Sequence, residues 1–212
     1  MNVRSSLLAS ALKRGVDLAG ALVLGGPAFV VVVVAGTLVW LRSPGPLLFR
    51  SMRETRDGKP FAMLKLRTMV VDAEEQLERA LAASPARRDE WVRYRRLTED
   101  PRVVPGVGRV LRQWSVDELP QLWNVLRGEM SLVGPRPLEL DVASRLPSGP
   151  MRTRRLVRPG MTGLWQVSGR SEVDLEALCA IDAEYVQRWS LRSDLEILFR
   201  TPAAVLSRRG AY

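Results

Sequence analysis

The chain has 212 residues, with 32 lysines and arginines against 23 aspartates and glutamates, so its formal net charge is +9. A surplus of this size points to an anionic partner, which can be nucleic acid, an acidic membrane surface or a phosphorylated substrate. With no histidine and one cysteine, Cys179, the chain excludes serine–histidine catalysis, cysteine–histidine catalysis and an internal disulfide, which leaves carboxylates, lysine, arginine and hydroxyl groups and favours phosphoryl chemistry.

Residues 19–41 form a run of 23 residues without a charge. A straight helix of that length reaches about 34 Å, enough to cross a hydrocarbon core of about 30 Å. The run is too long for the apolar part of a signal peptide. Gly25, Gly26 and Pro27 lie in its first half and predict a kink or a break in the helix.

Basic residues flank the apolar run on both sides. They are Lys13 and Arg14 before it, and Arg42, Arg50, Arg53 and Arg56 after it. A spanning helix usually has asymmetric flanks, whereas a hairpin that enters and leaves the same leaflet can be basic at both ends. The residues alone leave two topologies open, a re-entrant helix broken at Pro27 and a kinked spanning helix.

The rest of the chain predicts an α+β domain that is mainly helical. "RDGKP" between two apolar stretches predicts a small β-hairpin within residues 42–69. Residues 72–97 predict charged helices interrupted at Ser84-Pro85. Residues 190–209 alternate charges with apolar residues at helical spacing and predict an amphipathic helix, facing the core or lying at a membrane interface.

The stretch "SVDELPQLWNVL", residues 115–126, places two acids side by side in a basic chain. Ser115 and Glu118 match a capping box, which offers a purely structural role for the acids at the head of a helix. Arg112 precedes the pair and Arg136 follows it in a stiff "GPRP" loop, so the surroundings predict an anion site. There, an ionised Asp117 can attack phosphorus and a second carboxylate can hold Mg²⁺. The helix N-terminus and the arginines should favour the ionised form of Asp117.

Residues 158–170, "RPGMTGLWQVSGR", predict a loop punctuated by glycine and proline that carries Trp165, Gln166 and Arg170. Such a loop can cradle a ligand, although turn chemistry accounts for its glycines equally well.

Together these stretches resemble the bacterial sugar transferase family, the small monotopic phosphoglycosyl transferases that load polyprenol phosphate carriers. The resemblance extends from about Lys13 to Leu206. The matching stretches are "KRGVD", "SPGP", "KLRTM", "DPRVV", "GRVLRQWSVDELPQLWNVLRGEMSLVGPRP", "RPGMTGLWQVSGR" and "DAEYVQRWSLRSDLEIL". Ser51 and Thr55 stand where the family often has Gln and Gly, and Gly-Pro forms the break where Ser-Pro is common.

The resemblance implies an architecture. Residues 1–42 would contain a re-entrant membrane helix broken at Pro27, with Lys13 and Arg14 at the membrane interface. Residues 43–212 would form a compact catalytic domain with amphipathic interfacial helices, on the cytoplasmic face of the bacterial plasma (inner) membrane. Larger relatives have extra membrane helices before the catalytic domain. Nothing before residue 1 could form such helices here, so we expect the catalytic core alone.

The resemblance also implies a reaction, the first membrane step of glycoconjugate or exopolysaccharide synthesis. Asp117 would attack the sugar-linked phosphate of a UDP-sugar and expel UMP, and undecaprenyl phosphate would then take the sugar phosphate. Glu118 would bind Mg²⁺. The remaining site residues would be Arg112, Arg136, Lys65 and Arg67 for substrate phosphates, and Gln166 and Arg170 for the nucleotide or sugar. Acidic lipids are expected partners, nucleic acid is not, and a homodimer is left open.

Two other functions stay open on the residues. The first is a membrane-tethered nucleic-acid-binding protein, favoured by the basic charge but not by an aromatic content of 6% or by any nucleic-acid motif. The second is a membrane phosphatase that uses the same aspartyl chemistry with water as acceptor. The sugar that is transferred is not determined by the sequence.

Overall fold

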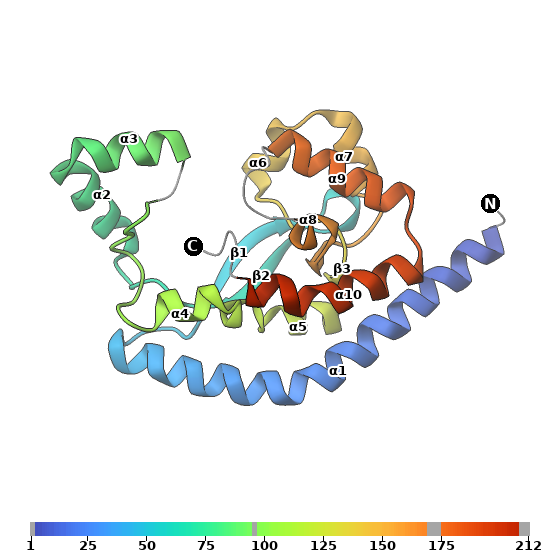
Figure 1. The fold of residues 1–212 in the computed structure, drawn as a ribbon, viewed down its shortest axis with the longest axis horizontal. Coiled ribbons are helices and arrows are strands. Elements are labelled where there is room, and N and C mark those ends of the chain that lie inside the picture. Colours follow the sequence, from blue (N-terminus) through green and yellow to red (C-terminus); the bar gives the residue numbers. More distant parts are fainter. Residues whose placement is uncertain (1–2, 95–96, 169–174, 208–212) are drawn as a thin grey trace.

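The computed structural model describes residues 3–94, 97–168 and 175–207. This part of the chain is mainly helical with two small sheets, as the sequence predicts (Figure 1). The elements in chain order are α1 (Val3–Arg42), β1 (Leu48–Glu54), η1 (Arg56–Gly58), β2 (Pro60–Leu66), α2 (Ala73–Ala83), α3 (Pro85–Tyr94), α4 (Gly108–Gln113), η2 (Val116–Glu118), α5 (Gln121–Arg127), β3 (Ser131–Val133), α6 (Leu140–Arg145), α7 (Ser148–Arg154), β4 (Gly160–Thr162), α8 (Leu164–Val167), α9 (Leu175–Gln187) and α10 (Leu191–Leu206).

The long N-terminal helix α1 bends along its length but is not interrupted (Figure 1). Its 40 residues include Pro27, so the predicted break at this proline is corrected to a helix that continues through it. A proline removes one backbone hydrogen bond and can bend a helix without ending it. Ala9–Arg42 is the one stretch in the described residues that is long and apolar enough to cross a membrane, and its most apolar 18-residue window has a mean hydropathy of 2.4.

The two faces of α1 differ in side-chain size. Ala21, Ala28 and Ala35 are buried against the rest of the protein and recur every seven residues. Gly20 lies so close to Leu132 that an added Cβ would be 2.6 Å from the leucine Cδ1. Large apolar side chains on the other face are exposed, namely Leu22, Val23, Phe29, Val30, Val34, Trp40 and Leu41. An exposed apolar surface of this extent indicates membrane association.

Helix α1 shares its core with the domain that follows it. Ala21 and Ala28 belong to a cluster with residues of β2, α5, β3, α9 and α10, and Ala35 and Val39 belong to a second cluster around Leu66. A third cluster lies between α6, α7 and α9 and contains Cys179. The apolar helix is therefore packed against the domain along much of its length.

The predicted hairpin is present. Strands β1 and β2 are antiparallel, with Phe49 opposite Lys65 and Ser51 opposite Met63, and η1 connects them. Asp57 and Gly58 in this connection both have positive φ angles, 63° and 72°. Successive side chains of a strand point to opposite faces, so the odd-numbered residues of β1, which are Phe49, Ser51 and Arg53, share one face of the hairpin.

The segment predicted as a loop at residues 158–170 contains regular structure where it is described. Its β4 pairs in parallel with β3, and α8 follows directly, so the loop prediction is wrong for these residues. The glycines permit the pairing, because a Cβ on Gly160 would lie only 2.1 Å from the backbone nitrogen of Gly134. Residues 169 and 170 lie outside the described part.

Two predicted helical features are confirmed. The interruption at Ser84-Pro85 separates α2 from α3, and the two helices project together from one end of the protein (Figure 1). At the C-terminal end, α10 is amphipathic and starts at a capping box formed by Ser190 and Ser193. It buries Ile197 while Phe199 is exposed.

Candidate active site

A cavity of about 890 Å³ lies between the β1–β2 hairpin, η2, the start of α2 and α8. Its lining contains seven of the site residues predicted from the sequence: Lys65, Arg67, Arg112, Asp117, Glu118, Arg136 and Gln166. These residues come from segments far apart in the chain. The remaining predicted pocket residue, Arg170, lies outside the described residues.

The acid pair lies in η2, a single turn between α4 and α5. Ser115 lies between α4 and η2 in the left-handed region, with φ 54°, and its N–H donates to the carbonyl of Arg112 at 3.0 Å. Its side chain makes no capping hydrogen bond in the described structure, and α5 begins only at Gln121, after Pro120. The capping box is therefore wrong, and capping does not account for the two acids.

Asp117 is buried, with 8% of its surface exposed. Burial raises the pKa of its carboxyl to about 6; Lys65 and Arg112 oppose the shift, and Glu118 adds to it. The direction is the reverse of the predicted one, because loss of water outweighs the attraction of the cations. At neutral pH the carboxylate is still mainly ionised, and it is poorly solvated, which suits a nucleophile.

Glu118 faces the cavity next to Asp117 and pairs with Lys65, whose Nζ donates to Oε1 at 2.8 Å. In the described residues, no group of three or more acidic, histidine or cysteine side chains could hold a metal ion. Mg²⁺ binds through one or two carboxylates and completes its shell with water and substrate phosphates. The pair of adjacent carboxylates fits a magnesium site of that kind and does not fit a metal enclosed by protein.

Arg112 is held by the segment that follows β2. Its Nε donates to the hydroxyl of Thr68 at 2.8 Å. Burial lowers the pKa of the guanidinium, and the negative charges of Asp117 and Asp100 oppose this change. Arg112 therefore places a positive charge close to Asp117, as the anion-site hypothesis requires.

Arg136 lies on the cavity wall between Pro135 and Pro137. Its side chain is exposed, and the guanidinium carbon is 4.8 Å from the centroid of the Trp165 ring. Stacking on an aromatic face orients the flat guanidinium group. Gln166, also on the wall, is buried, and its Oε1 has no hydrogen-bond partner among the described residues.

Arg67 was predicted to bind a substrate phosphate, but its guanidinium group binds other parts of the protein. Its Nε donates to the carbonyl of Pro46 at 2.6 Å, and its terminal nitrogens donate to Ser43 and to the carbonyl of Met69. Only 6% of the residue is exposed. Arg67 therefore supports the "SPGP" turn, and its contacts do not favour the predicted role in binding substrate phosphate.

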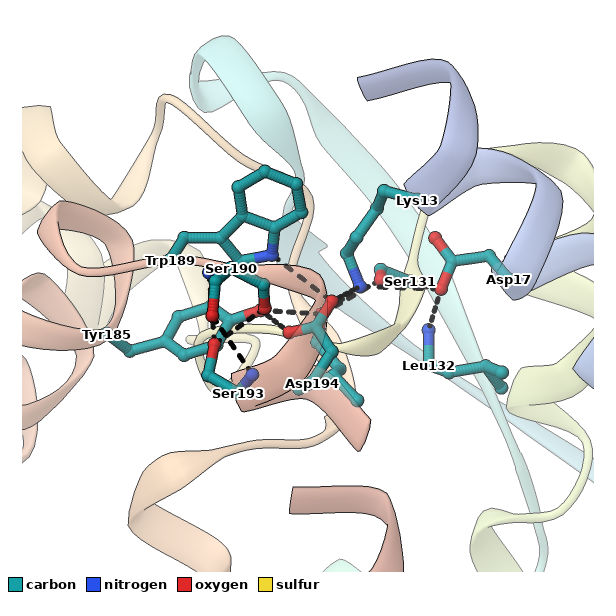
Figure 2. Close-up of polar contacts among 10 residues, drawn as sticks. Lys13, Asp17, Ser131, Leu132, Tyr185, Trp189, Ser190, Ser193 and Asp194 are labelled. Carbon is teal, nitrogen blue, oxygen red and sulfur yellow. Dashed lines mark hydrogen bonds and ion pairs between the residues drawn. The ribbon is translucent and has the colours of Figure 1, made fainter. Parts of the chain in front are cut away.

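Lys13 lies in a buried polar cluster that joins α1 to α10, shown in Figure 2. Its Nζ is 2.7 Å from Oδ2 of Asp194 and 3.5 Å from Oδ1 of Asp17. Asp194 also accepts hydrogen bonds from the hydroxyl of Tyr185 at 2.6 Å and from Nε1 of Trp189 at 3.1 Å. The cluster fixes the start of the apolar helix to the C-terminal helix.

Arg14 is also bound within the protein. It donates to the carbonyls of Val125 at 2.7 Å and Leu126 at 3.0 Å, at the end of α5. Like Lys13, it was assigned to the membrane interface because charges beside an apolar helix usually lie in the headgroup region. Both side chains bind groups of the protein, and their place at the membrane interface stays a prediction.

Sequence reasoning did not assign Arg53 to the site, although Arg53 lines the cavity. Its Nη2 lies 2.8 Å from Oε1 of Glu139, and burial lowers the pKa of its guanidinium. Phe49 and Ser51 line the same wall. The period-two alternation of a strand places residues 49, 51 and 53 on one face, and this signal was available once Lys65 was assigned to the hairpin.

The fold and the cavity define a membrane-associated protein in which a buried carboxylate lies beside a second carboxylate and several cations on one cavity wall. The chain belongs to the bacterial sugar transferase family, which it matches over residues 8–208. This match confirms the resemblance seen in the motifs.

Individual relatives support the same membership. The chain is 45% identical over 204 residues to a UDP-galactose-lipid carrier transferase of Erwinia amylovora, covering 95% of this chain and 42% of that protein. It is 43% identical over 203 residues to the exopolysaccharide production protein ExoY of Rhizobium meliloti, covering 94% and 88%. A UDP-glucose:undecaprenyl-phosphate glucose-1-phosphate transferase of Caulobacter vibrioides is 40% identical over 209 residues, covering 94% and 72%. The chain spans about two fifths of the length of several curated relatives that it matches.

Proposed function

We propose that this protein transfers a sugar 1-phosphate from a UDP-sugar to undecaprenyl phosphate through a covalent intermediate on Asp117. The observation that carries the proposal is the burial of Asp117 in the wall of the cavity, beside Glu118 and close to Lys65 and Arg112. The names of the relatives from Erwinia and Caulobacter support the same class of donor and acceptor.

In the first half-reaction, a carboxylate oxygen of Asp117 attacks the phosphorus that bears the sugar. A new oxygen–phosphorus bond forms, the bond from this phosphorus to the bridging oxygen breaks, and UMP leaves with the electron pair. Arg112, Lys65 and Arg136 supply positive charge along the cavity wall, where the negative charge of the diphosphate has to be balanced. The attack needs no general base, because Asp117 is mainly ionised at neutral pH.

In the second half-reaction, a phosphate oxygen of undecaprenyl phosphate attacks the same phosphorus. The bond between Asp117 and phosphorus breaks, and the carboxylate is restored. The product carries the sugar on a diphosphate joined to the lipid. Because the acceptor is also an anion, the cations near Asp117 serve both halves of the reaction.

Magnesium fits this proposal through Glu118 together with substrate oxygens. When bound, the ion would neutralise part of the charge on the diphosphate. Lys65 holds Glu118 at the edge of the cavity through their ion pair, so this lysine positions the carboxylate.

We further propose that α1 enters and leaves one leaflet on the cytoplasmic face of the inner membrane, where nucleotide sugars are made. Lys13 contacts Asp194, and Val39 belongs to the core cluster around Leu66. These two positions are about 39 Å apart along a straight helix, which exceeds the thickness of the hydrocarbon core. Because both contact the same domain, the contacts support a helix that does not cross the bilayer. Arg42 and Arg50, which follow the apolar run, are exposed and suit acidic lipids.

The test is a transfer assay on the full chain in lipid nanodiscs, with radiolabelled UDP-galactose or UDP-glucose and undecaprenyl phosphate. The proposal expects label in the organic phase and UMP in water, both dependent on Asp117. Free sugar phosphate in water would indicate a phosphatase. Failure to turn over any donor in a panel of UDP-sugars, together with binding of DNA or RNA, would indicate a tethered nucleic-acid-binding protein.

A further inference from the structure

A buried ion pair joins α7 to α9. Nη2 of Arg154 is 3.2 Å from Oδ2 of Asp182, and the two side chains are only 6% and 1% exposed. Taking two charges out of water is unfavourable, and apolar replacements of such pairs are often as stable or more stable. The contribution of this pair to stability is therefore a weak explanation for its presence.

Both members of the pair bind the main chain of Arg136. Oδ2 of Asp182 accepts a hydrogen bond from the Arg136 N–H at 3.2 Å. Nη2 of Arg154 donates to the Arg136 carbonyl. The neighbours Pro135 and Pro137 have no N–H to donate, and their rings restrict the backbone. The backbone at position 136 is thus fixed on both sides by two charged groups from two different helices.

The side chain of Arg136 points the other way, toward the cavity. It lines the same wall as Asp117, and it stacks on Trp165 of α8. Helix α8 itself packs against α9, which carries Asp182. The two hydrogen bonds therefore fix the backbone of Arg136, and the Trp165 ring orients its guanidinium group.

We infer that Arg154 and Asp182 are positioning residues. They act on the substrate only through Arg136, by fixing its backbone so that its guanidinium group faces the phosphates of the substrate. This inference rests on the proposed function, since it requires Arg136 to bind a phosphorylated donor. An arginine that binds a phosphate through two parallel hydrogen bonds loses much of its contribution to catalysis when its guanidinium group is displaced by about 1 Å.

The test is a double-mutant cycle between Asp182→Asn and Arg136→Ala. For each variant, kcat/KM is measured with UDP-galactose or UDP-glucose, and Kd is measured with UDP alone. When Arg136 is present, Asp182→Asn should lower kcat/KM about tenfold and raise the Kd for UDP about tenfold. In the Arg136→Ala background the same substitution should change each quantity by less than about twofold. An equal loss in both backgrounds, or no loss in the first, would overturn the inference.

A second variant separates positioning from folding. Arg154→Met with Asp182→Leu removes both charges together and leaves no unpaired ion, so the thermal midpoint should stay close to that of the wild type. Its kcat/KM should still fall to about the level of Arg136→Ala. If this folded variant keeps wild-type transfer and wild-type affinity for UDP, the pair does not position Arg136.

Arg155→Met provides the matched control. Arg155 is the next residue along from Arg154 and forms an ion pair with Glu54 at 2.7 Å. In the described structure neither Arg155 nor Glu54 forms a hydrogen bond or an ion pair with Arg136, so loss of this pair should change transfer by less than about twofold. A tenfold loss in Arg155→Met would attribute the effect to disturbance of α7 and contradict the inference. Absence of lipid-linked product from the wild type would instead reject the proposed function, whereas the UDP affinities still test the pair.

Discussion

Replacement of Asp117 by asparagine should stabilise the folded protein at neutral pH while abolishing transfer. Burial raises the pKa of this carboxyl from 3.8 to about 6. The difference corresponds to a cost of about 3 kcal/mol for keeping the carboxylate ionised in the folded state. Asparagine has nearly the same shape and no charge, so it avoids this cost, but it cannot form an acyl phosphate.

The sign of the pH dependence follows from which state binds the proton more tightly. Because the pKa is higher in the folded state, this group favours folding most below pH 4, and that contribution is lost as the pH rises through about 6. The advantage of Asp117→Asn should therefore be largest at pH 7 and above. It should shrink as the pH falls through 6 and vanish near pH 4.

The assay is thermal unfolding followed by tryptophan fluorescence, in detergent with EDTA, at a fixed heating rate between pH 4 and pH 8. For a chain of this size, about 3 kcal/mol corresponds to a rise of roughly 6–12 °C in the midpoint. Glu118→Gln is the control, since its carboxylate is 35% exposed and its ion pair with Lys65 is worth at most about 1 kcal/mol. A lower midpoint for Asp117→Asn, or a gain that does not change with pH, would refute the reasoning.

Three further outcomes are expected. Lys13→Met should lower the free energy of unfolding by about 3–5 kcal/mol in the same assay, because Asp194 is left buried without its cation; an unchanged midpoint would contradict this. A cysteine at position 2 should resist an impermeant thiol reagent in intact cells, with buried Cys179 unreactive as background, whereas labelling would indicate a spanning helix. Arg136→Lys should lose at least about tenfold in kcat/KM with an unchanged midpoint, since lysine lacks the two-point fork; full activity would place Arg136 outside the site.

Elements with a strong local signal were predictable from the sequence. The hairpin follows from two apolar stretches around "RDGKP", and the division of α2 from α3 follows from Ser84-Pro85. That the acid pair lines one cavity with Arg112 and Arg136 was also predictable, because two carboxylates among arginines are unusual. These features depend only on neighbours within a few residues.

Features that depend on tertiary packing were not predictable. Strands β3 and β4 are too short to show a periodic pattern, and their pairing requires Gly134 and Gly160 to meet from distant parts of the chain. The pKa of Asp117 is raised, whereas the sequence predicted that it would be lowered. The reason is burial, which depends on the whole fold and cannot be read from neighbouring residues. The ion pair between Lys13 and Asp194 was not predictable either, because nothing local indicates that Asp194 lies beside Lys13.

The most direct test of the central claim is a single incubation of the wild-type protein with the UDP-sugar that it uses, without undecaprenyl phosphate. The account predicts a burst of about one equivalent of UMP per protein and a mass increase of one sugar phosphate on the peptide that contains Asp117. Later addition of undecaprenyl phosphate should remove this mass and place the sugar phosphate on the lipid. Asp117→Asn should show neither the burst nor the mass increase. A protein that releases UMP only when the lipid is present and never carries the added mass, or an Asp117→Asn variant that remains active, would contradict the covalent mechanism.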